Sequence, residues 1–275
     1  MKIDTVATAF AQARHKLTSD TSALDARLLM QAATDLSHAE VIAEPNRAMT
    51  KAQIEIFEGF IERRLAHEPV SRILGAREFY GRSFKISPAV LDPRADTECV
   101  VELAMKLTPR GQFIDLGTGS GAIAITLCAE NSNLTGVASD LSTNALAVAK
   151  HNAETLGVSN QLRFHHGAWL EGIQNRFDLI ISNPPYIKQD DQLPPDVTSY
   201  DPHLALFGGL DGLDSYRSIA AQSASHLTLN GTVVVEIGLE QADNVVEIFA
   251  ANGFQLVTKA FDIAQHIRGL AFRSE

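Results

Sequence analysis

Short apolar segments of strand length alternate with helical segments through the second half of the sequence, and this alternation constrains the fold most. Strands are predicted at residues 113–116, 135–139, 162–166, 179–182, 233–237, 255–260 and 269–273. Residues 122–129, 143–155, 215–225 and 240–251 have helical periodicity. The alternation predicts an α/β fold with a mostly parallel, doubly wound sheet. The connection over residues 261–267 is too short for a helical crossover, so the last strand should pair antiparallel.

The N-terminal part of the chain has the pattern of a small helical bundle. Its first 16 residues suit an amphipathic helix better than a signal peptide, because charged residues interrupt the apolar ones. Residues 52–65 form another helical segment, Thr18-Ser19-Asp20 and Thr50 are expected helix caps, and residues 75–93 suggest a hairpin or linker strands. We therefore expect a helical domain at 1–72, a linker at 73–94 and an α/β domain at 95–275.

Charge and composition narrow the classes of partner. The net charge is −10, whereas a protein that grips duplex nucleic acid unaided usually has a basic face. No apolar run approaches the ~20 residues of a membrane-spanning helix. Cys99 and Cys128 form no C-x-x-C pair and are expected to be free thiols, and the histidines have no metal-binding spacing. We expect a cytoplasmic monomer without a metal, a membrane contact or direct contact with nucleic acid.

A glycine-rich motif lies between the first predicted strand of the sheet and the helix that follows. It reads Asp115-Leu116-Gly117-Thr118-Gly119-Ser120-Gly121. Its glycines allow a tight turn and the close approach of a ligand to the backbone. Gly117, Gly119 and Ala122 also fit the dinucleotide pattern G-x-G-x-x-A. Asp115 argues against that alternative, because a carboxylate repels a pyrophosphate but can hold a cationic amino acid group.

A candidate cofactor site is completed by two residues, each of which lies at or after the end of one of the next two predicted strands. Asp140 lies 23 residues after Gly117, at the end of the second strand, and fits an acceptor for ribose hydroxyls. It also suits the N-cap of the following helix, and both roles are compatible. Trp169, the only tryptophan, follows the third strand, where an indole can stack on or flank an adenine ring.

The segment Asn183-Pro184-Pro185-Tyr186 follows the fourth predicted strand. It has the groups needed to bind a planar nitrogen that would accept a methyl group. Ligands of open α/β sheets bind beyond the carboxyl ends of the strands. The Asn183 side-chain oxygen and the Pro184 carbonyl can each accept one N–H of a planar amide or amine, and Tyr186 can pack on that group. This would aim the nitrogen lone pair at a methyl sulfonium. No general base stands out, so orientation and electrostatics would provide the acceleration.

These motifs and their flanking blocks closely resemble the HemK/PrmC family of protein-(glutamine-N5) methyltransferases over nearly the whole chain. The loop at Asn183 is shared with adenine-N6 DNA methyltransferases, whereas the blocks around Arg94 and Gly208-Gly209 are more discriminating. The other matching blocks are Glu68-Pro69-Val70, Arg72-Ile73-Leu74-Gly75, Glu78-Phe79-Tyr80-Gly81, Asp96-Thr97-Glu98, Asp140-Leu141-Ser142, Tyr200-Asp201-Pro202, Glu236-Ile237-Gly238 and Gln241.

The resemblance implies a Rossmann-like class I methyltransferase domain that uses S-adenosylmethionine. Its substrate would be the glutamine in the Gly-Gly-Gln motif of class I peptide chain release factors, docked with help from the N-terminal helices. The implied cofactor-binding residues are Asp115, Gly117, Thr118, Gly119, Ser120, Gly121, Asp140, Trp169 and Asn183. The implied substrate-binding residues are Asn183, Pro184, Pro185 and Tyr186, and Asn183, Pro184 and Tyr186 would be catalytic.

The sequence leaves three alternative functions open. It also departs from the family pattern at four positions. The alternatives are a ribosomal-protein glutamine methyltransferase, an adenine-N6 nucleic-acid methyltransferase, and a non-catalytic binding module with the same fold. The last is disfavoured because the cofactor and acceptor motifs are both intact. The departures are Asp92 for an aliphatic residue, Ala95 for proline, Ala168 for an acidic or small polar residue, and Gln265 for a frequent glycine.

Overall fold

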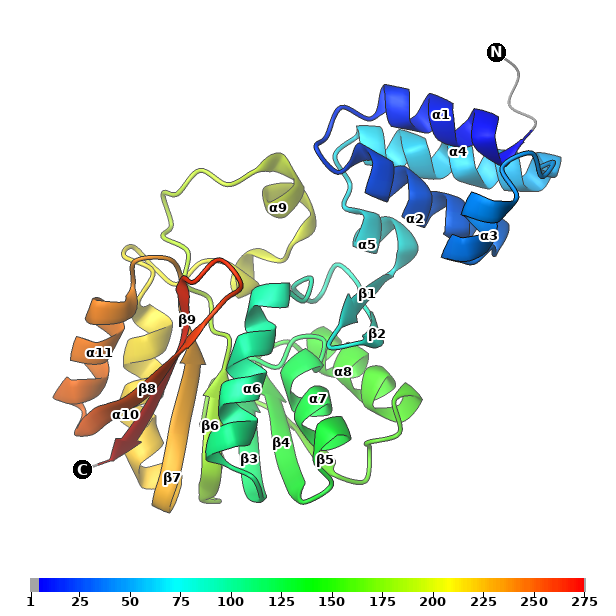
Figure 1. Cartoon of the computed structure of the whole chain (residues 1–275). Coiled ribbons are helices and arrows are strands. Elements are labelled where there is room, and N and C mark those ends of the chain that lie inside the picture. Colours follow the sequence, from blue (N-terminus) through cyan, green and yellow to red (C-terminus); the bar gives the residue numbers. More distant parts are fainter. Residues whose placement is uncertain (1–4, 275) are drawn as a thin grey trace. The chain divides into compact units, whose positions relative to one another are not determined.

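The computed structural model describes residues 5–274, which form two compact units (Figure 1). One unit contains the chain up to residue 76 together with residues 194–200, and the other contains residues 77–193 and 201 onward. The amphipathic helix expected over residues 1–16 begins at Val6, and its first four residues lie outside the described part of the chain.

The first unit is helical. Its helices are α1 (Val6–Lys16), α2 (Ser22–Thr34), α3 (His38–Ala43), α4 (Lys51–Leu65), α5 (Val70–Leu74) and α9 (Pro195–Tyr200). Their buried faces share one apolar core that includes Ala9, Leu29, Met30, Phe57 and Ile61. Burial of these side chains provides the main stabilisation, because helices this short are marginal in isolation.

The helix caps confirm one prediction and correct another. Thr50 is the N-cap of α4 and forms a capping box with Gln53, as expected from the sequence. The cap predicted at Thr18-Ser19-Asp20 is wrong, because the Ser22 amide donates to the Ser19 carbonyl and this turn delays the start of α2. The N-cap is instead Thr21, which makes no side-chain capping bond.

Pro195 begins the short helix α9, which lies in a segment rich in aspartate and proline. Proline is favoured in the first turn of a helix, where its missing N–H costs no hydrogen bond. The hydroxyl of Tyr200, at the other end of α9, donates to the Ala66 carbonyl at 3.1 Å. This bond attaches α9 to the helical unit.

The second unit contains a seven-stranded sheet in the order β5-β4-β3-β6-β7-β9-β8. Its strands are β3 (Gly111–Leu116), β4 (Leu134–Asp140), β5 (Leu162–His166), β6 (Phe177–Ser182), β7 (Leu227–Glu236), β8 (Phe254–Phe261) and β9 (Ile267–Ser274). Each lies at a strand position predicted from the sequence. The first five are parallel, and β9 is antiparallel to both β7 and β8, as the short connection required.

Helices cover both faces of this sheet (Figure 1). Successive side chains of a strand point to opposite faces, so β7 directs Val234 to one core and Val233 and Val235 to the other. The first core is covered by α6 (Glu98–Leu107), α7 (Ala122–Glu130) and α8 (Thr143–Thr155), and the second by α10 (Asp214–His226) and α11 (Ala242–Ala251).

The remaining elements are short. β1 (Ala76–Phe79) and β2 (Arg82–Lys85) form the predicted hairpin strands, and the 3-10 turns η1 (Ala95–Thr97) and η2 (His203–Ala205) precede α6 and the loop at Gly208. Cys99 and Cys128 are free thiols, as predicted. No helix between residues 5 and 274 combines the length and apolar character that crossing a membrane requires.

Buried Asn152 on α8 connects the hairpin to the glycine-rich loop. Its Oδ1 accepts the Lys85 amide at 2.9 Å, while its Nδ2 donates to the carbonyls of Lys85 at 3.0 Å and Ser120 at 2.9 Å. The side chain is only 2% exposed, so water cannot replace these bonds.

Replacement of Asn152 by alanine should therefore lower the free energy of unfolding by about 1–3 kcal/mol, the usual loss when buried partners are left unsatisfied. Urea denaturation measures this change as a lower midpoint at an unchanged slope. Asn160→Ala, on an exposed side chain, should stay within about 0.5 kcal/mol of the unchanged protein. Equal midpoints for the two variants would contradict the role of Asn152.

Candidate functional site

The carboxyl ends of the parallel strands meet at one edge of the sheet. The register pairs Leu116 of β3 with Ser139 of β4 and with Ser182 of β6, and it pairs Ser182 with Val235 of β7. The glycine-rich loop, Asp140 and Asn183 therefore leave the sheet side by side. This is the edge at which open α/β sheets bind their ligands.

A cavity of about 480 Å³ opens at this edge. Its volume lies within the ~300–1,000 Å³ of small-molecule sites. The predicted site residues that line it are Gly117, Thr118, Gly119, Ser120, Asp140, Trp169, Asn183 and Pro185. Four others, Asp115, Gly121, Pro184 and Tyr186, fall outside the lining formed by the described residues. The structure thus brings the cofactor motif and the acceptor motif to one cavity.

The glycine-rich loop has a backbone that only glycines adopt easily. Gly117, Gly119 and Gly121 all have positive φ, at +70°, +56° and +83°. A Cβ atom on Gly121 would also lie 2.7 Å from the Ile125 Cδ1 atom. The loop therefore needs glycine both for its turn and for the packing of α7 beneath it.

Asp115 lies behind this loop. Its carboxyl is 1% exposed, and the Thr118 hydroxyl donates to its Oδ2 at 2.6 Å. Burial raises the pKa of Asp115 to about 7, against the lowering effect of the hydrogen bond from Thr118. The Oδ2 atom thus contacts the loop itself, and the contact with a cationic ligand that the sequence suggested stays a prediction.

Asp140 connects the glycine-rich loop to α8. Its Oδ2 accepts the Gly119 amide at 2.9 Å, and its Oδ1 accepts the Ser142 amide at 2.8 Å. The N-cap of α8 is Ser142, whose hydroxyl accepts the Ala145 amide, so the N-cap role considered for Asp140 is wrong. A carboxylate has about four acceptor positions, which leaves two for hydroxyls of a ligand in the cavity.

Trp169 lines the cavity beside Gly117. Its backbone has φ +52°, which is uncommon for a residue other than glycine. The indole packs against the core under α10, and a Cβ on Gly117 would lie 3.9 Å from its Cζ3 atom. The strained backbone at a cavity wall is consistent with a functional position.

Asn183 leaves β6 with its side chain in a polar cluster. Its Nδ2 donates to the Thr97 hydroxyl at 3.2 Å. Hydrogen bonding by Thr97 and Asn183 lowers the pKa of the nearby buried carboxyl of Glu236. Burial raises the pKa of Glu236 to about 7, and the hydrogen bond from Thr97 opposes this rise. Sequence reasoning assigned no role to Glu236, although a charged residue that ends an apolar strand is a recognisable signal.

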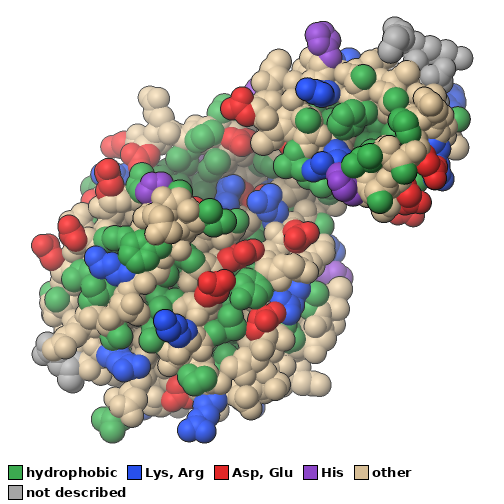
Figure 2. Space-filling view, viewed as in Figure 1, with side chains coloured by type: hydrophobic (Ala, Val, Ile, Leu, Met, Phe, Trp, Pro, Cys, Tyr) green, Lys and Arg blue, Asp and Glu red, His purple; other side chains and the backbone are tan. Residues whose placement is uncertain are grey.

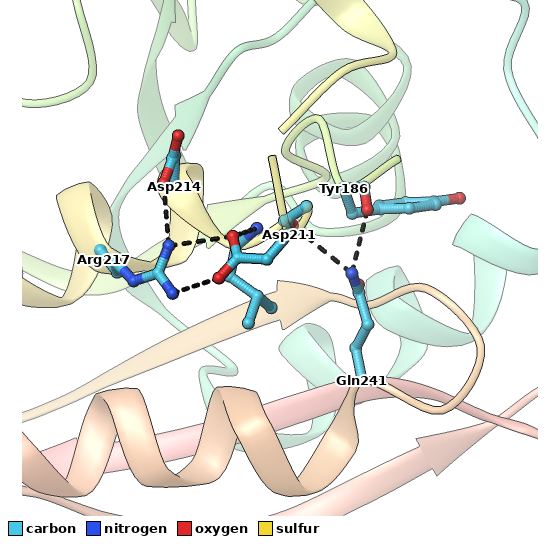
Figure 3. A network of polar contacts seen from close by, with 7 residues as sticks. Tyr186, Asp211, Asp214, Arg217 and Gln241 are labelled. Carbon is cyan, nitrogen blue, oxygen red and sulfur yellow. Dashed lines mark hydrogen bonds and ion pairs between the residues drawn. The ribbon is translucent and has the colours of Figure 1, made fainter. Parts of the chain in front are cut away.

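The backbone after Asn183 is held by Gln241 (Figure 3). The Gln241 Nε2 donates to the Tyr186 carbonyl at 2.9 Å, while its Oε1 accepts the Gly238 amide at 3.0 Å. Burial raises the pKa of the Tyr186 phenol to about 12, so it remains protonated at neutral pH. Gln241 is itself 8% exposed and is a second residue to which sequence reasoning gave no role.

A glycine loop packs directly against this backbone. A Cβ on Gly208 would lie 2.5 Å from the Pro185 carbonyl oxygen, and one on Gly212 would lie 2.4 Å from that of Tyr186. Side chains are therefore excluded at both positions. Arg217 fixes the outer side of the loop by ion pairs with Asp211 and Asp214 (Figure 3), and its hydrogen bond lowers the pKa of Asp211 to about 2.

The departures from the family pattern lie at the margins of this site. Ala168 lines the cavity, and Ala95 begins η1. Asp92 is 5% exposed, and its Oδ1 lies 3.8 Å from the Arg77 Nε. Gln265 has φ +67° in the β8–β9 turn, a conformation that explains why glycine is frequent there.

The chain matches two known protein families and is similar in sequence to known methyltransferases. Residues 8–75 match the family described as PrmC N-terminal domain, and residues 95–199 match the methyltransferase small domain. The chain is 41% identical over 259 residues to the release factor glutamine methyltransferase of Agrobacterium fabrum, covering 91% of this chain and 90% of that protein. It is 44% identical over 236 residues to the protein of the same name from Bradyrhizobium diazoefficiens, covering 83% and 80%.

Solved structures share the sheet. A methyltransferase from Pyrococcus furiosus matches with a TM-score of 0.54 and 20% identity over 70% of this chain and 89% of that one. The ribosomal protein L11 methylase of Lactobacillus delbrueckii subsp. bulgaricus matches with a TM-score of 0.51 and 22% identity, covering 66% and 80%. These similarities concern the fold alone, and they confirm the predicted methyltransferase-like sheet.

The raised pKa of Asp115 predicts a pH dependence of stability. In the folded protein its pKa is about 7, above the usual value of 3.8 for this side chain. The stabilisation that comes from the neutral carboxyl is therefore complete below about pH 4 and is lost as the pH rises through about 7. Asp115→Asn should flatten the unfolding free energy over this interval. Burial also raises the pKa of Glu236 to about 7, so part of the slope of the unfolding free energy against pH should remain in this variant.

Urea unfolding at a series of pH values measures this effect. Asp190→Asn, on an exposed side chain, is the matched control and should keep the slope of the unchanged protein. An Asp115→Asn variant with that same slope would show that the buried carboxyl does not titrate in this interval.

Proposed function

This chain belongs to the family of release factor glutamine methyltransferases, and we propose that it methylates the side-chain amide N5 of the glutamine in the Gly-Gly-Gln motif of class I release factors. The methyl donor is S-adenosylmethionine. The observation that carries the proposal is the cavity in which the glycine-rich loop and Asn183 face the same space. Neither motif alone distinguishes this activity, but their juxtaposition supplies a donor site and an acceptor site within one chain.

The cavity residues fit the cofactor. The positive-φ glycines permit close approach of a ligand to the backbone, Asp140 has acceptor positions for ribose hydroxyls, and Trp169 offers an aromatic wall for a base. When bound, S-adenosylmethionine supplies an electrophilic methyl group. Asp115 contributes from behind the loop, because its contact with Thr118 fixes the loop conformation.

Asn183 and its neighbours act by orientation. The Asn183 Nδ2 is engaged by Thr97, which leaves its Oδ1 to accept one N–H of the substrate amide, while the Pro184 carbonyl accepts the other. Tyr186 packs on the planar amide as a neutral phenol, since its pKa is raised to about 12 by burial. These contacts direct the nitrogen lone pair toward the donor, the type of positioning that supplies much of an enzymatic rate.

The proposal extends to the domains and partners. Residues 1–72 dock the release factor, and residues 95–275 transfer the methyl group. Residues 73–94 connect these two domains. One chain supplies the cavity lining, so a monomer suffices, and the cytoplasm is where release factors meet ribosomes. Over the face of the sheet unit seen in Figure 2, basic and acidic side chains are interspersed, which with the net charge of −10 supports a protein substrate over a nucleic acid.

Mass spectrometry tests the substrate directly. Purified release factor, ribosomal protein and DNA are each incubated with the enzyme and isotopically labelled cofactor. We expect one methyl group on the glutamine of the Gly-Gly-Gln motif. A methyl group on adenine, or on a ribosomal-protein glutamine with none on the release factor, would overturn the proposal.

Asn183→Ala should lower kcat by about 10²–10³-fold, the usual effect of losing one hydrogen-bonding group that acts on the transition state. Calorimetry should find the cofactor still bound, because the glycine-rich loop, Asp140 and Trp169 remain. Asn252→Ala, on an exposed side chain, is the control. Methylation of the release factor at the normal rate by Asn183→Ala would refute the assignment.

A further inference from the structure

A buried carboxyl group lies behind the segment Asn183-Pro184-Pro185-Tyr186, which we call the acceptor loop. Glu236 ends β7 and is 1% exposed. The register pairs Ser182 of β6 with Val235 of β7, so the next residues along each strand, Asn183 and Glu236, leave the sheet as neighbours. Strand alternation directs Glu236 to the same face as Val234, the face that α6 covers, and η1 directly precedes α6 in the chain. Thr97 ends η1 and completes the cluster.

The hydrogen bonds of this cluster have only one consistent direction. An ionised carboxylate only accepts, and a threonine hydroxyl carries a single proton. Thr97 must therefore donate to Glu236 and accept from the Asn183 Nδ2, at 3.2 Å. The Asn183 amide also lowers the pKa of Glu236 as a hydrogen-bond donor, and an amide can donate only through its Nδ2. A reversed amide would place Oδ1 against acceptors and lose these bonds.

We propose that Glu236, acting with Thr97, is a positioning residue that holds the Asn183 amide with its oxygen toward the substrate nitrogen. The inference rests on the proposed function, because it assigns the acceptor atom for the glutamine amide. It also gives the buried carboxyl a purpose, since an isolated buried charge is costly unless it is hydrogen-bonded. Its negative charge polarises the Asn183 amide and makes Oδ1 a stronger acceptor.

The charged state of Glu236 depends on every group around it. Burial raises its pKa to about 7, while the hydrogen bonds from Thr97 and Asn183 and the positive charge of Arg268 oppose the rise. Arg268 is itself paired with Asp96 at 3.1 Å and with Asp262 at 2.9 Å. The other titratable groups that interact with Glu236 electrostatically are Asp96, Cys99, Tyr186 and Tyr216.

Protonation should weaken the cluster. The Oε2 atom of Glu236 accepts no hydrogen bond from residues 5–274, so it can take the proton. The neutral carboxyl then accepts more weakly, because bonds to an ionised acceptor are about twice as strong. For the unchanged enzyme, kcat should therefore fall as the pH drops through about 7. This is the direction expected of a group that acts in its ionised form.

Three variants test the inference. Thr97→Val removes the hydroxyl at nearly constant volume and should lower kcat by about 10- to 100-fold, the loss of a charge-assisted bond, with little change in KM or in the Kd of the cofactor. Thr97→Ser restores the hydroxyl and should recover most of kcat. Glu236→Gln should lower kcat and abolish its fall near pH 7. Thr155→Val, at an exposed site on α8, is the matched control.

The outcomes separate this inference from the proposed function. If the unchanged enzyme leaves release-factor glutamine unmethylated, the proposed function fails. If it methylates glutamine but Thr97→Val keeps full kcat, or Glu236→Gln keeps the original pH profile, the positioning role fails. Parallel loss of cofactor binding and of thermal stability in Thr97→Val, without recovery in Thr97→Ser, would also overturn it, because the cluster would then have only a structural role.

Discussion

Parallel pairing of β3 with β4 on one side and with β6 on the other determines where every group of the site lies. In a parallel sheet all carboxyl ends reach the same edge, so residues far apart in sequence leave the strands as neighbours. Asp140 and Glu236 end β4 and β7, Asn183 follows β6, and Asp115 is the last residue but one of β3. A different strand order would separate them, and the cavity would lose either the glycine-rich loop or the acceptor loop.

The strand ends also explain the burial of charge in this protein. Asp115 and Glu236 are each 1% exposed, and burial raises the pKa of both to about 7. Each carboxyl hydrogen-bonds to a threonine hydroxyl, from Thr118 or Thr97, and each stands behind a loop that faces the cavity. Such buried polar groups cost stability unless their hydrogen bonds are made, so they fix the two loops in one conformation.

Backbone packed against backbone gives the acceptor loop its rigidity. Gly208 and Gly212 lie against the carbonyls of Pro185 and Tyr186, closer than any side chain would allow. Gln241 holds the Tyr186 carbonyl from a second side. The loop is therefore constrained before a substrate arrives, which reduces the entropy that binding must remove. Such orientation of reacting groups can supply much of an enzymatic rate.

The sequence by itself determined the strands, the alternation that makes the sheet parallel, and the motifs that line the cavity, because periodicity and glycine patterns act locally. It did not determine that Asp115 would contact Thr118, that Ser142 rather than Asp140 would cap α8, or that Pro195 would begin a helix. Above all, Thr97, Asn183 and Glu236 come from three distant segments with no shared local pattern. Only the register of β6 with β7 and the contact of Thr97 with Asn183 bring them together, because hydrogen bonds between side chains depend on tertiary distances that a local pattern does not contain.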